Sequence, residues 1–377
     1  MNATMDKLDA ALQGNDAQAL WNLGSSYLAL EKFDEAQRVL GRAVDLAPKA
    51  FMVRLHYAHA LERLGRDQAA LANYFGAITQ AQSQNRWLSD DTTAPPLRQL
   101  VKHAMSYTYH GRKQAFEALL APLRAQHGED ALRRIADGLR IYLGELPANY
   151  PDPRQRPKFL YVPGLPATTY FDRDLFPWYA ALEAQFTAIR EELGEVLAAP
   201  QGIEPFLKSH KPEDVRGYLG GIEKPVWDAY FFYRHGERYA EHHERCPRTS
   251  AALDAVPSLC RIREHGPEVC FSVLTPGTHI LKHRGVTNTR LVTHFPLIVP
   301  DNCAISVGGE ERVWREGECF SFDDTFEHEA WNRSNSTRVV MLLDVWNPHL
   351  TPVEREAVTT LVEGIGDFND EAGIDRE

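Results

Sequence analysis

The chain has 377 residues, of which 44% are hydrophobic and 25% charged, and its formal net charge is −11. This length accommodates two domains, and the apolar fraction supports full-sized cores. The negative charge argues against a nucleic-acid partner, which needs a basic face. No apolar run reaches the ~18–20 residues of a membrane span, and the first residues lack a signal-peptide pattern. We therefore expect a cytoplasmic protein without a membrane segment.

The cysteines do not form a recognisable framework. They are odd in number and contain no C-x-x-C pair (Cys246, Cys260, Cys270, Cys303 and Cys319). A disulfide scaffold or a zinc knuckle would need paired spacings. We expect buried free thiols.

Residues 1–145 are predicted to form a helical repeat domain. Residues 17–50 place small and large apolar residues at the positions of a 34-residue helix–turn–helix repeat (Leu20, Leu23, Gly24, Tyr27, Leu30, Phe33, Ala36, Ala43 and Pro48). A shift of 34 residues finds a second, weaker copy, and helical periodicity continues over 97–124 and 129–143. This region resembles tetratricopeptide repeats. The weaker helices are expected to complete the stack, because about three units are needed to bury a continuous core.

Residues 146–170 are predicted to be an extended linker. Six prolines fall between 147 and 166, and proline at this density prevents regular structure. Apolar residues with helical spacing then predict a helix over about 178–197. The linker therefore marks a domain boundary, and residues 171–377 form the second domain.

From about residue 225 the pattern changes to short strands separated by turns. Aromatic and β-branched runs cover 227–233, 269–274, 291–299, 303–307, 318–322 and 338–346, with Pro-Gly, Gly-Gly and Asp-Asn turns between them. Such spacing is typical of a sandwich or jelly roll. Thr351-Pro-Val-Glu354 is a capping box that starts a final helix running to about Gly364. The fold class is thus α + β multidomain.

Two histidines in strand-like sequence carry the chemical signal of this second domain. His283 and His328 are followed, ten residues after the second, by Arg338. This is the layout of a non-haem iron site that also holds a 2-oxoacid, since imidazole suits ferrous iron and open positions remain for the oxoacid and O₂. The usual carboxylate two residues after the first histidine is replaced by Gly285. From the residues alone, a third ligand is sought at Asp323 or Asp324.

Alternation along the strand 290–297 supports an anion site nearby. Arg290 and His294 share one face, and burying both without partners would cost several kcal/mol. Arg338 opens the most hydrophobic strand, where a guanidinium can form a bidentate pair with a carboxylate. The alternatives stay open at this point: a solvated strand face, an edge salt bridge and structural histidines.

The motifs around these residues resemble those of the aspartyl/asparaginyl β-hydroxylases. The similarity spans roughly Pro163 to Leu350 and includes FSVLTPGTH at 271–279, HRGVTNTRLVTH at 283–294, FDDTFEHEAW at 322–331, Arg338, and DVWNP at 344–348. The helical repeats ahead of this domain are also similar to the animal members.

This resemblance implies a double-stranded β-helix, of the jelly-roll or cupin-like kind, with flanking helices. It implies Fe(II) held by His283 and His328 alone, with glycine at 285 and water in the place of the carboxylate. Asp323 and Asp324 would then have supporting roles. It further implies that 2-oxoglutarate, used with O₂, contacts Ser272, His294 and Arg338.

The resemblance also bears on the substrate. It places Arg290 at the substrate end of the pocket. Val292 stands where animal members carry a second arginine, which weakens an acidic specificity. We expect an Fe(II)- and 2-oxoglutarate-dependent hydroxylase acting on the β-carbon of an Asp or Asn residue, or on a related amino-acid substrate.

Two alternative functions stay open beside this one. They are a halogenase-like oxygenase with a two-histidine site, and a repeat scaffold with an inactive oxygenase domain. An acyl chain is a further substrate candidate. The repeat groove is suited to a peptide or partner protein, or it mediates self-association.

Overall fold

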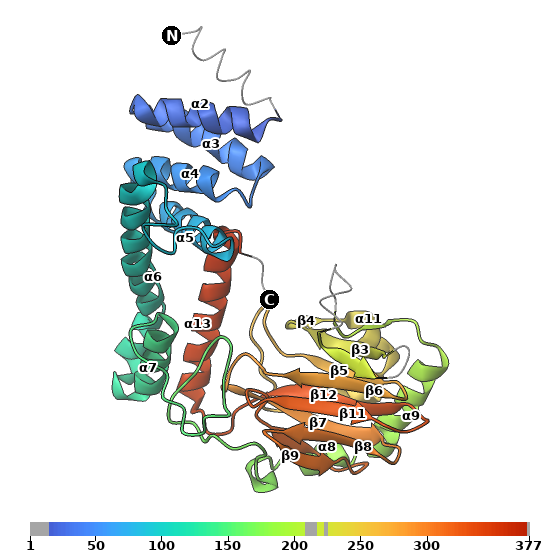
Figure 1. Ribbon diagram of the computed structural model, residues 1–377. Helices are drawn as coiled ribbons and strands as arrows, with labels where there is room; N and C mark the ends of the chain where they lie inside the picture. The colour runs from blue at the N-terminus through green and yellow to red at the C-terminus, as the bar shows by residue number, and fades with distance from the viewer. Residues whose placement is uncertain (1–14, 208–216, 222–224, 375–377) are drawn as a thin grey trace. The chain divides into compact units, whose positions relative to one another are not determined.

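The computed structural model describes residues 15–207, 217–221 and 225–374. Its internal contacts divide the chain into two compact units, drawn in Figure 1. Unit 1 comprises Met1–Pro122 with Gly364–Glu377, and unit 2 comprises Leu123–Glu363. The expected segments 1–145, 146–170 and 171–377 stay predictions about which parts fold independently.

Unit 1 is built from antiparallel helix pairs. The first two pairs lie where the sequence pattern predicts them, and a long helix follows them: α2 (Ala17–Ala29), α3 (Phe33–Leu46), α4 (Phe51–Arg63), α5 (Asp67–Ser83) and α6 (Arg98–His127). Small residues allow the close packing, because a Cβ at Gly24 would overlap the side chain of Leu40. Two apolar clusters, one between the pairs and one reaching into α6, form the core.

The last helix of the chain also contributes to unit 1. Helix α13 (Pro352–Glu371) continues past the Gly364 end expected from the sequence. Beyond that point, the ring of Phe368 lies 5.3 Å from Phe75 and 5.5 Å from Phe116, measured between centroids. The helical repeat is therefore completed both by α6, as expected, and by a segment from the far end of the chain, which the sequence did not indicate.

Unit 2 contains two antiparallel sheets, drawn in Figure 1. One sheet has the order β1-β3-β5-β12-β7-β10, with β4 on β3, and the other has the order β2-β6-β11-β8-β9. The strands are β1 (Ile203–Pro205), β2 (Leu219–Gly221), β3 (Trp227–Arg234), β4 (Glu237–Arg238), β5 (Val269–Leu274), β6 (Thr278–His283), β7 (Arg290–Ile298), β8 (Cys303–Val307), β9 (Glu310–Val313), β10 (Phe320–Phe322), β11 (His328–Asn332) and β12 (Arg338–Trp346). This is the expected double-stranded β-helix.

Each face of the larger sheet buries its own apolar cluster. One cluster lies between the two sheets and contains residues of both, such as Val292, Ile305, Phe322 and Val340. The other lies beneath the flanking helices α8 (Tyr179–Glu183), α9 (Phe186–Ala198) and α12 (Pro247–Asp254). Alternation along β7 sends Val292 to the first cluster and Leu291 to the second.

Two local predictions have different outcomes. The single helix expected over 178–197 is two helices, α8 and α9, interrupted at Ala184 and Gln185. The capping box is confirmed, since Thr351 N donates to Glu354 Oε2 at 2.9 Å and Glu354 N donates to Thr351 Oγ1 at 3.2 Å.

All five cysteines are buried free thiols, as expected.

Candidate active site

The two histidines singled out by the sequence face each other across neighbouring strands. His283 ends β6 and His328 begins β11, and the antiparallel register pairs these two residues directly. Their ring centroids are 4.0 Å apart and the rings are inclined by 52°. The fold thus brings together two imidazoles from distant parts of the chain.

The hydrogen bonds of these histidines fix which ring nitrogen is free. The Nδ1 atom of His283 lies 2.8 Å from the carbonyl oxygen of Leu281, and that of His328 lies 3.0 Å from Phe326 O. A carbonyl oxygen only accepts, so each Nδ1 donates a proton and each Nε2 keeps its lone pair. Backbone carbonyls orient metal-binding imidazoles in this same way.

Burial keeps both rings neutral. It lowers the pKa of His283, and it lowers the pKa of His328 to about 3, with the His283 ring as the second cause. Neutral imidazoles with free Nε2 lone pairs are the form that binds a divalent metal. The donor set therefore fits Fe(II), with the remaining positions left to other ligands.

Gly285 and Asp324 share one space beside the histidines. A Cβ added at Gly285 would overlap the carboxyl group of Asp324, while Gly285 N donates to Asp324 O at 2.7 Å. Within the described residues Asp324 Oδ1 is buried and has no hydrogen-bond partner. Burial raises the pKa of Asp324 to about 7, against an opposing effect of Arg290. The carboxyl group of Asp324 thus occupies the space in which the Cβ of a side chain at 285 would lie.

Both carboxylate oxygens of the neighbouring Asp323 accept hydrogen bonds from other residues. Its Oδ1 accepts from Thr325 N at 2.9 Å and from the Thr325 hydroxyl, and its Oδ2 accepts from Gln155 Nε2 at 2.6 Å. Over the ranges that the structure describes, no group of three or more His, Cys, Asp or Glu residues is arranged to hold a metal. Of the two acids, Asp324 is therefore the one with an oxygen available near the histidines.

Arg338 is a buried cation without a carboxylate partner in the described part of the chain. It is 2% exposed, and burial lowers the pKa of its guanidinium to about 10. Nη1 donates to Ser272 O at 3.2 Å and to Ser272 Oγ at 3.4 Å, and Nε has no partner. The guanidinium carbon lies 4.9 Å from the centroid of the Trp314 ring. An isolated buried charge is unfavourable, and an anionic ligand would compensate it.

His294 presents a donor in the same region. Trp314 Nε1 donates to its Nδ1 at 3.1 Å, so the proton of the neutral ring is on Nε2. The pKa of His294 is well below its ordinary value because of burial and, next, the charge of Arg338. Similarly, Trp227 Nε1 donates to Ser272 Oγ at 2.9 Å. Arg338, His294 and Ser272 are thus the polar groups suited to a dicarboxylate.

The two tryptophans were not predicted from the sequence. Each is nearly buried, and each uses its indole N–H to orient a predicted ligand-binding side chain. The available sequence signal was weak: Trp227 opens a strand, and Trp314 follows the short charged strand β9. Buried tryptophan usually satisfies its N–H, but the acceptor cannot be named without the fold.

Arg290 is paired within the protein. Its Nη1 lies 2.6 Å from Asp344 Oδ2, and the same oxygen accepts from Glu268 N at 2.9 Å. The charge of Asp344 is among the factors that raise the pKa of Arg290 against the opposing effect of burial. The contact of Arg290 with substrate stays a prediction.

Comparison with known proteins agrees with this architecture. Residues 183–348 match the family model Aspartyl/Asparaginyl beta-hydroxylase, and residues 17–49 match the tetratricopeptide repeat. The mouse "Aspartate beta-hydroxylase domain-containing protein 2" is 31% identical over 259 residues, covering 67% of this chain and 71% of that protein. The chain belongs to the aspartyl/asparaginyl β-hydroxylase family.

Two further relatives differ in what their names describe. The human "Aspartyl/asparaginyl beta-hydroxylase" is 26% identical over 354 residues, which cover 92% of this chain and 40% of that protein. The Rhizobium tropici "Ornithine lipid ester-linked acyl 2-hydroxylase" is 34% identical over 186 residues, which cover 48% of this chain and 62% of that protein. The chain spans less than two thirds of either relative. In the part of the chain that the structure describes, every helix is too short or too polar to cross a membrane.

Proposed function

We propose that this protein is an Fe(II)- and 2-oxoglutarate-dependent dioxygenase that hydroxylates the β-carbon of an Asp or Asn residue in a peptide. The observation that carries the proposal is the juxtaposition of two neutral imidazoles, each with a free Nε2, on directly paired strands. Membership of a hydroxylase family disfavours the inactive scaffold and the halogenase-like alternative.

In this proposal His283 and His328 hold the iron. Bound iron with 2-oxoglutarate and O₂ would supply the oxidising power to break an unactivated C–H bond. Arg338 would pair with the distal carboxylate of 2-oxoglutarate, and Ser272 and the Nε2–H of His294 would offer further hydrogen bonds to it. Their fixed geometry orients the ligand, because Trp227 and Trp314 already hold Ser272 and His294 in place.

The surroundings of the site exclude water and hold one mobile proton. The cluster between the sheets contributes buried apolar side chains, among them Val292, Phe322 and Phe326. Burial raises the pKa of Asp324 to about 7, so its Oδ1, which has no hydrogen-bond partner among the described residues, can take up or release a proton near neutral pH. Arg290 would meet the substrate from its position beside Asp344.

A peptide substrate is favoured by the repeat unit and by the name of the human relative, which refers to aspartyl and asparaginyl residues. Helical repeats present surfaces suited to peptides or partner proteins. We propose that unit 1 binds the substrate protein or a partner of it. A cytoplasmic location stays a prediction.

The proposal is tested by iron content and succinate formation. The protein is loaded anaerobically with Fe(II), desalted, analysed for iron, and then supplied with O₂, ascorbate and 2-oxoglutarate. We expect one iron per chain and succinate release, with both lost in the His283→Ala and His328→Ala variants. His279→Ala is the matched control, since His279 lies on β6 but pairs with Glu329. Wild-type protein that neither retains iron nor forms succinate would overturn the proposal.

A further inference from the structure

The proline-rich segment borders the candidate active site. We call residues 155–162 the strap. Lys158 N and Phe159 N donate to Gly285 O and Val286 O at 3.3 and 2.8 Å. Upstream, Arg156 N donates to Thr325 O at 2.9 Å. The strap therefore runs along both segments that flank the histidines, the one after His283 and the one before His328.

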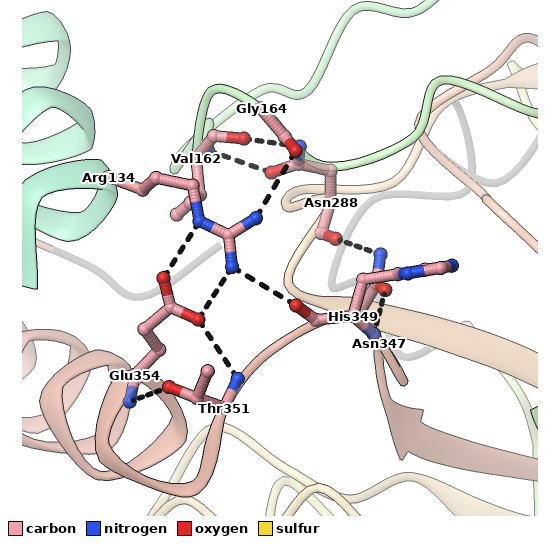
Figure 2. A network of polar contacts seen from close by, with 8 residues as sticks. All are labelled: Arg134, Val162, Gly164, Asn288, Asn347, His349, Thr351 and Glu354. Carbon is pink, nitrogen blue, oxygen red and sulfur yellow. Dashed lines mark hydrogen bonds and ion pairs between the residues drawn. The ribbon is translucent and has the colours of Figure 1, made fainter. Parts of the chain in front are cut away.

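A buried asparagine fastens the strap, as Figure 2 shows. Asn288 is fully buried; its Oδ1 accepts from Val162 N at 2.8 Å and its Nδ2 donates to Val162 O at 2.9 Å. Asn347 Nδ2 in turn donates to Asn288 O at 3.0 Å. One side chain thus satisfies both backbone groups of a strap residue, as a neighbouring strand would.

Helix α7 (Arg133–Tyr142) is fixed against the same segment. Arg134 Nη1 donates to Gly164 O at 3.2 Å, and its Nε donates to Glu354 Oε1 at 2.8 Å (Figure 2). A Cβ on Gly138 would lie 2.9 Å from Tyr161 O, so the helix backbone contacts the strap directly. These contacts hold the start and the middle of α7 beside the proline-rich segment, and Tyr142 at its other end contacts Phe159 of the strap.

A cavity of about 430 Å³ lies between α7 and the strap. Among its lining residues are the aromatic side chains of Tyr142, Tyr150, Phe159 and Tyr161, and the aliphatic ones of Ile141 and Leu146. Phe159 meets Tyr142 edge-on with 5.4 Å between centroids, and Tyr150 lies 4.7 Å from Tyr161. This volume lies in the range of ligand pockets, roughly 300–1,000 Å³. It would accommodate an apolar side chain and the backbone beside it.

Of the described residues that line the cavity, Lys158 is the one that carries a charge. Its side chain is exposed, and it forms no ion pair with the residues that the structure describes. Nearby Glu145 faces Arg140 at 3.7 Å, and the Arg156 guanidinium lies 4.4 Å from the Tyr150 ring centroid. The charge at this cavity is therefore positive and uncompensated, which favours an anionic group in its occupant.

We propose that this cavity is a substrate subsite for an acidic peptide segment next to the hydroxylated residue. An aspartate or glutamate of the peptide pairs with Lys158, and a neighbouring apolar side chain packs among the aromatic rings. The inference rests on the proposed function and deepens it, because it names the sequence that the enzyme would prefer around its target. The hydrogen bonds of the strap to Gly285 place this subsite beside the histidine pair.

The test measures peptide binding to the full chain without iron, by fluorescence anisotropy. The probes are three labelled peptides in a Gly/Ser background that carry Asp-Phe-Asp, Asn-Phe-Asn or Lys-Phe-Lys. We expect wild-type protein to prefer the acidic peptide. Lys158→Met should weaken that binding roughly fivefold to tenfold and leave the Asn peptide unchanged. Tyr142→Ala should weaken both the acidic and the Asn peptide.

Charge reversal gives the sharper discrimination. Lys158→Glu should shift the preference to the lysine peptide, whereas Lys102→Met, an exposed lysine paired with Asp90, should change nothing. Equal affinities of wild-type protein for the three peptides, or Lys158→Glu binding with the wild-type preference, would overturn the subsite. Succinate formation is followed separately. Charge-dependent peptide binding without succinate formation would overturn the proposed function but support the subsite. Succinate formation without charge-dependent binding would support the proposed function and overturn the subsite.

Discussion

The carboxyl group of Asp324 fills the space into which a side chain at Gly285 would project. The absence of a side chain at 285 and the presence of the acid at 324 are therefore one structural arrangement. Gly285 is not among the glycines with positive φ, so its backbone conformation does not by itself require glycine. Glycine is required at 285 because the carboxyl group of Asp324 leaves no room for a Cβ there.

The first prediction concerns this pair. Gly285→Ala should lower the free energy of unfolding by ~1–3 kcal/mol, because it overpacks a buried site. In an Asp324→Ala background the same change should cost less, with a coupling of ~0.5–3 kcal/mol. Urea unfolding of the four proteins measures this coupling, and additive effects would show that the two residues do not compete for space.

The second prediction concerns Arg338. Removing a buried cation that has no carboxylate partner among the described residues should leave the stability of the unliganded protein unchanged or increased, so Arg338→Met should not lower the melting temperature. Saturating 2-oxoglutarate should stabilise wild-type protein by about 2.7 kcal/mol at 100 times Kd, and should not stabilise the variant. Thermal unfolding with and without the ligand tests this.

Arg333→Met is the control for that experiment. Arg333 is exposed and packs on Trp331, so its variant should keep the full response to 2-oxoglutarate. A normal ligand response from Arg338→Met would remove this arginine from the cofactor site.

The third prediction is a pH dependence of stability. Burial raises the pKa of Asp323 from 3.8 to about 6. The folded state then binds more protons than the unfolded state, so stability is fully present below pH ~3.8 and falls as pH rises through about 6. The difference between the pKa of Asp323 in the unfolded and the folded state corresponds to a loss of about 3 kcal/mol in the free energy of unfolding.

Asp323→Asn should remove this part of the pH dependence. The buried Oε1 of Gln155 has no hydrogen-bond partner among the described residues, so a flip of the Gln155 amide lets this oxygen accept from the nitrogen that the substitution introduces. Urea unfolding between pH 4 and 7.5 should show a flatter profile for the variant. Parallel profiles for the two proteins would contradict the assignment.

The fourth prediction concerns the fastening of the strap. Asn288→Ala removes two buried hydrogen bonds to Val162 and should destabilise the protein by ~2–4 kcal/mol. Hydrogen exchange should accelerate at the amides of Phe159, Leu160 and Val162. The exposed Asn22→Ala is the control; equal exchange at the strap in both variants would show that Asn288 does not hold it.

Local patterns predicted the elements of the fold well where one residue type dominates. The strand Arg338–Trp346 was delimited correctly because its β-branched and apolar run is continuous, and the capping box at Thr351 fixed the start of α13. The end of that helix was misplaced by several residues. Its final turns are held by Phe75 and Phe116, which are too distant in sequence to leave a local signal.

The site was predicted in part. Sequence patterns and family resemblance pointed to His283 and His328, but their direct pairing depends on the register of β6 and β11. The pairing of Arg290 with Asp344 arises between β7 and β12 and could not be read from either strand alone. The residues alone suggested Asp323 or Asp324 as a third ligand, and that suggestion stays a prediction. The overlap of the Asp324 carboxyl group with a side chain at 285 is visible only in three dimensions.

The shared use of the last helix has a consequence for the order in which the protein forms during synthesis. Residues from Gly364 onward belong to unit 1, although the whole of unit 2 precedes them along the chain. A ribosome-bound chain can pair α2 with α3 and α4 with α5 early, but Phe75 and Phe116 stay without Phe368 until that residue emerges, after the whole of unit 2. The first unit to begin folding is thus the last to be completed.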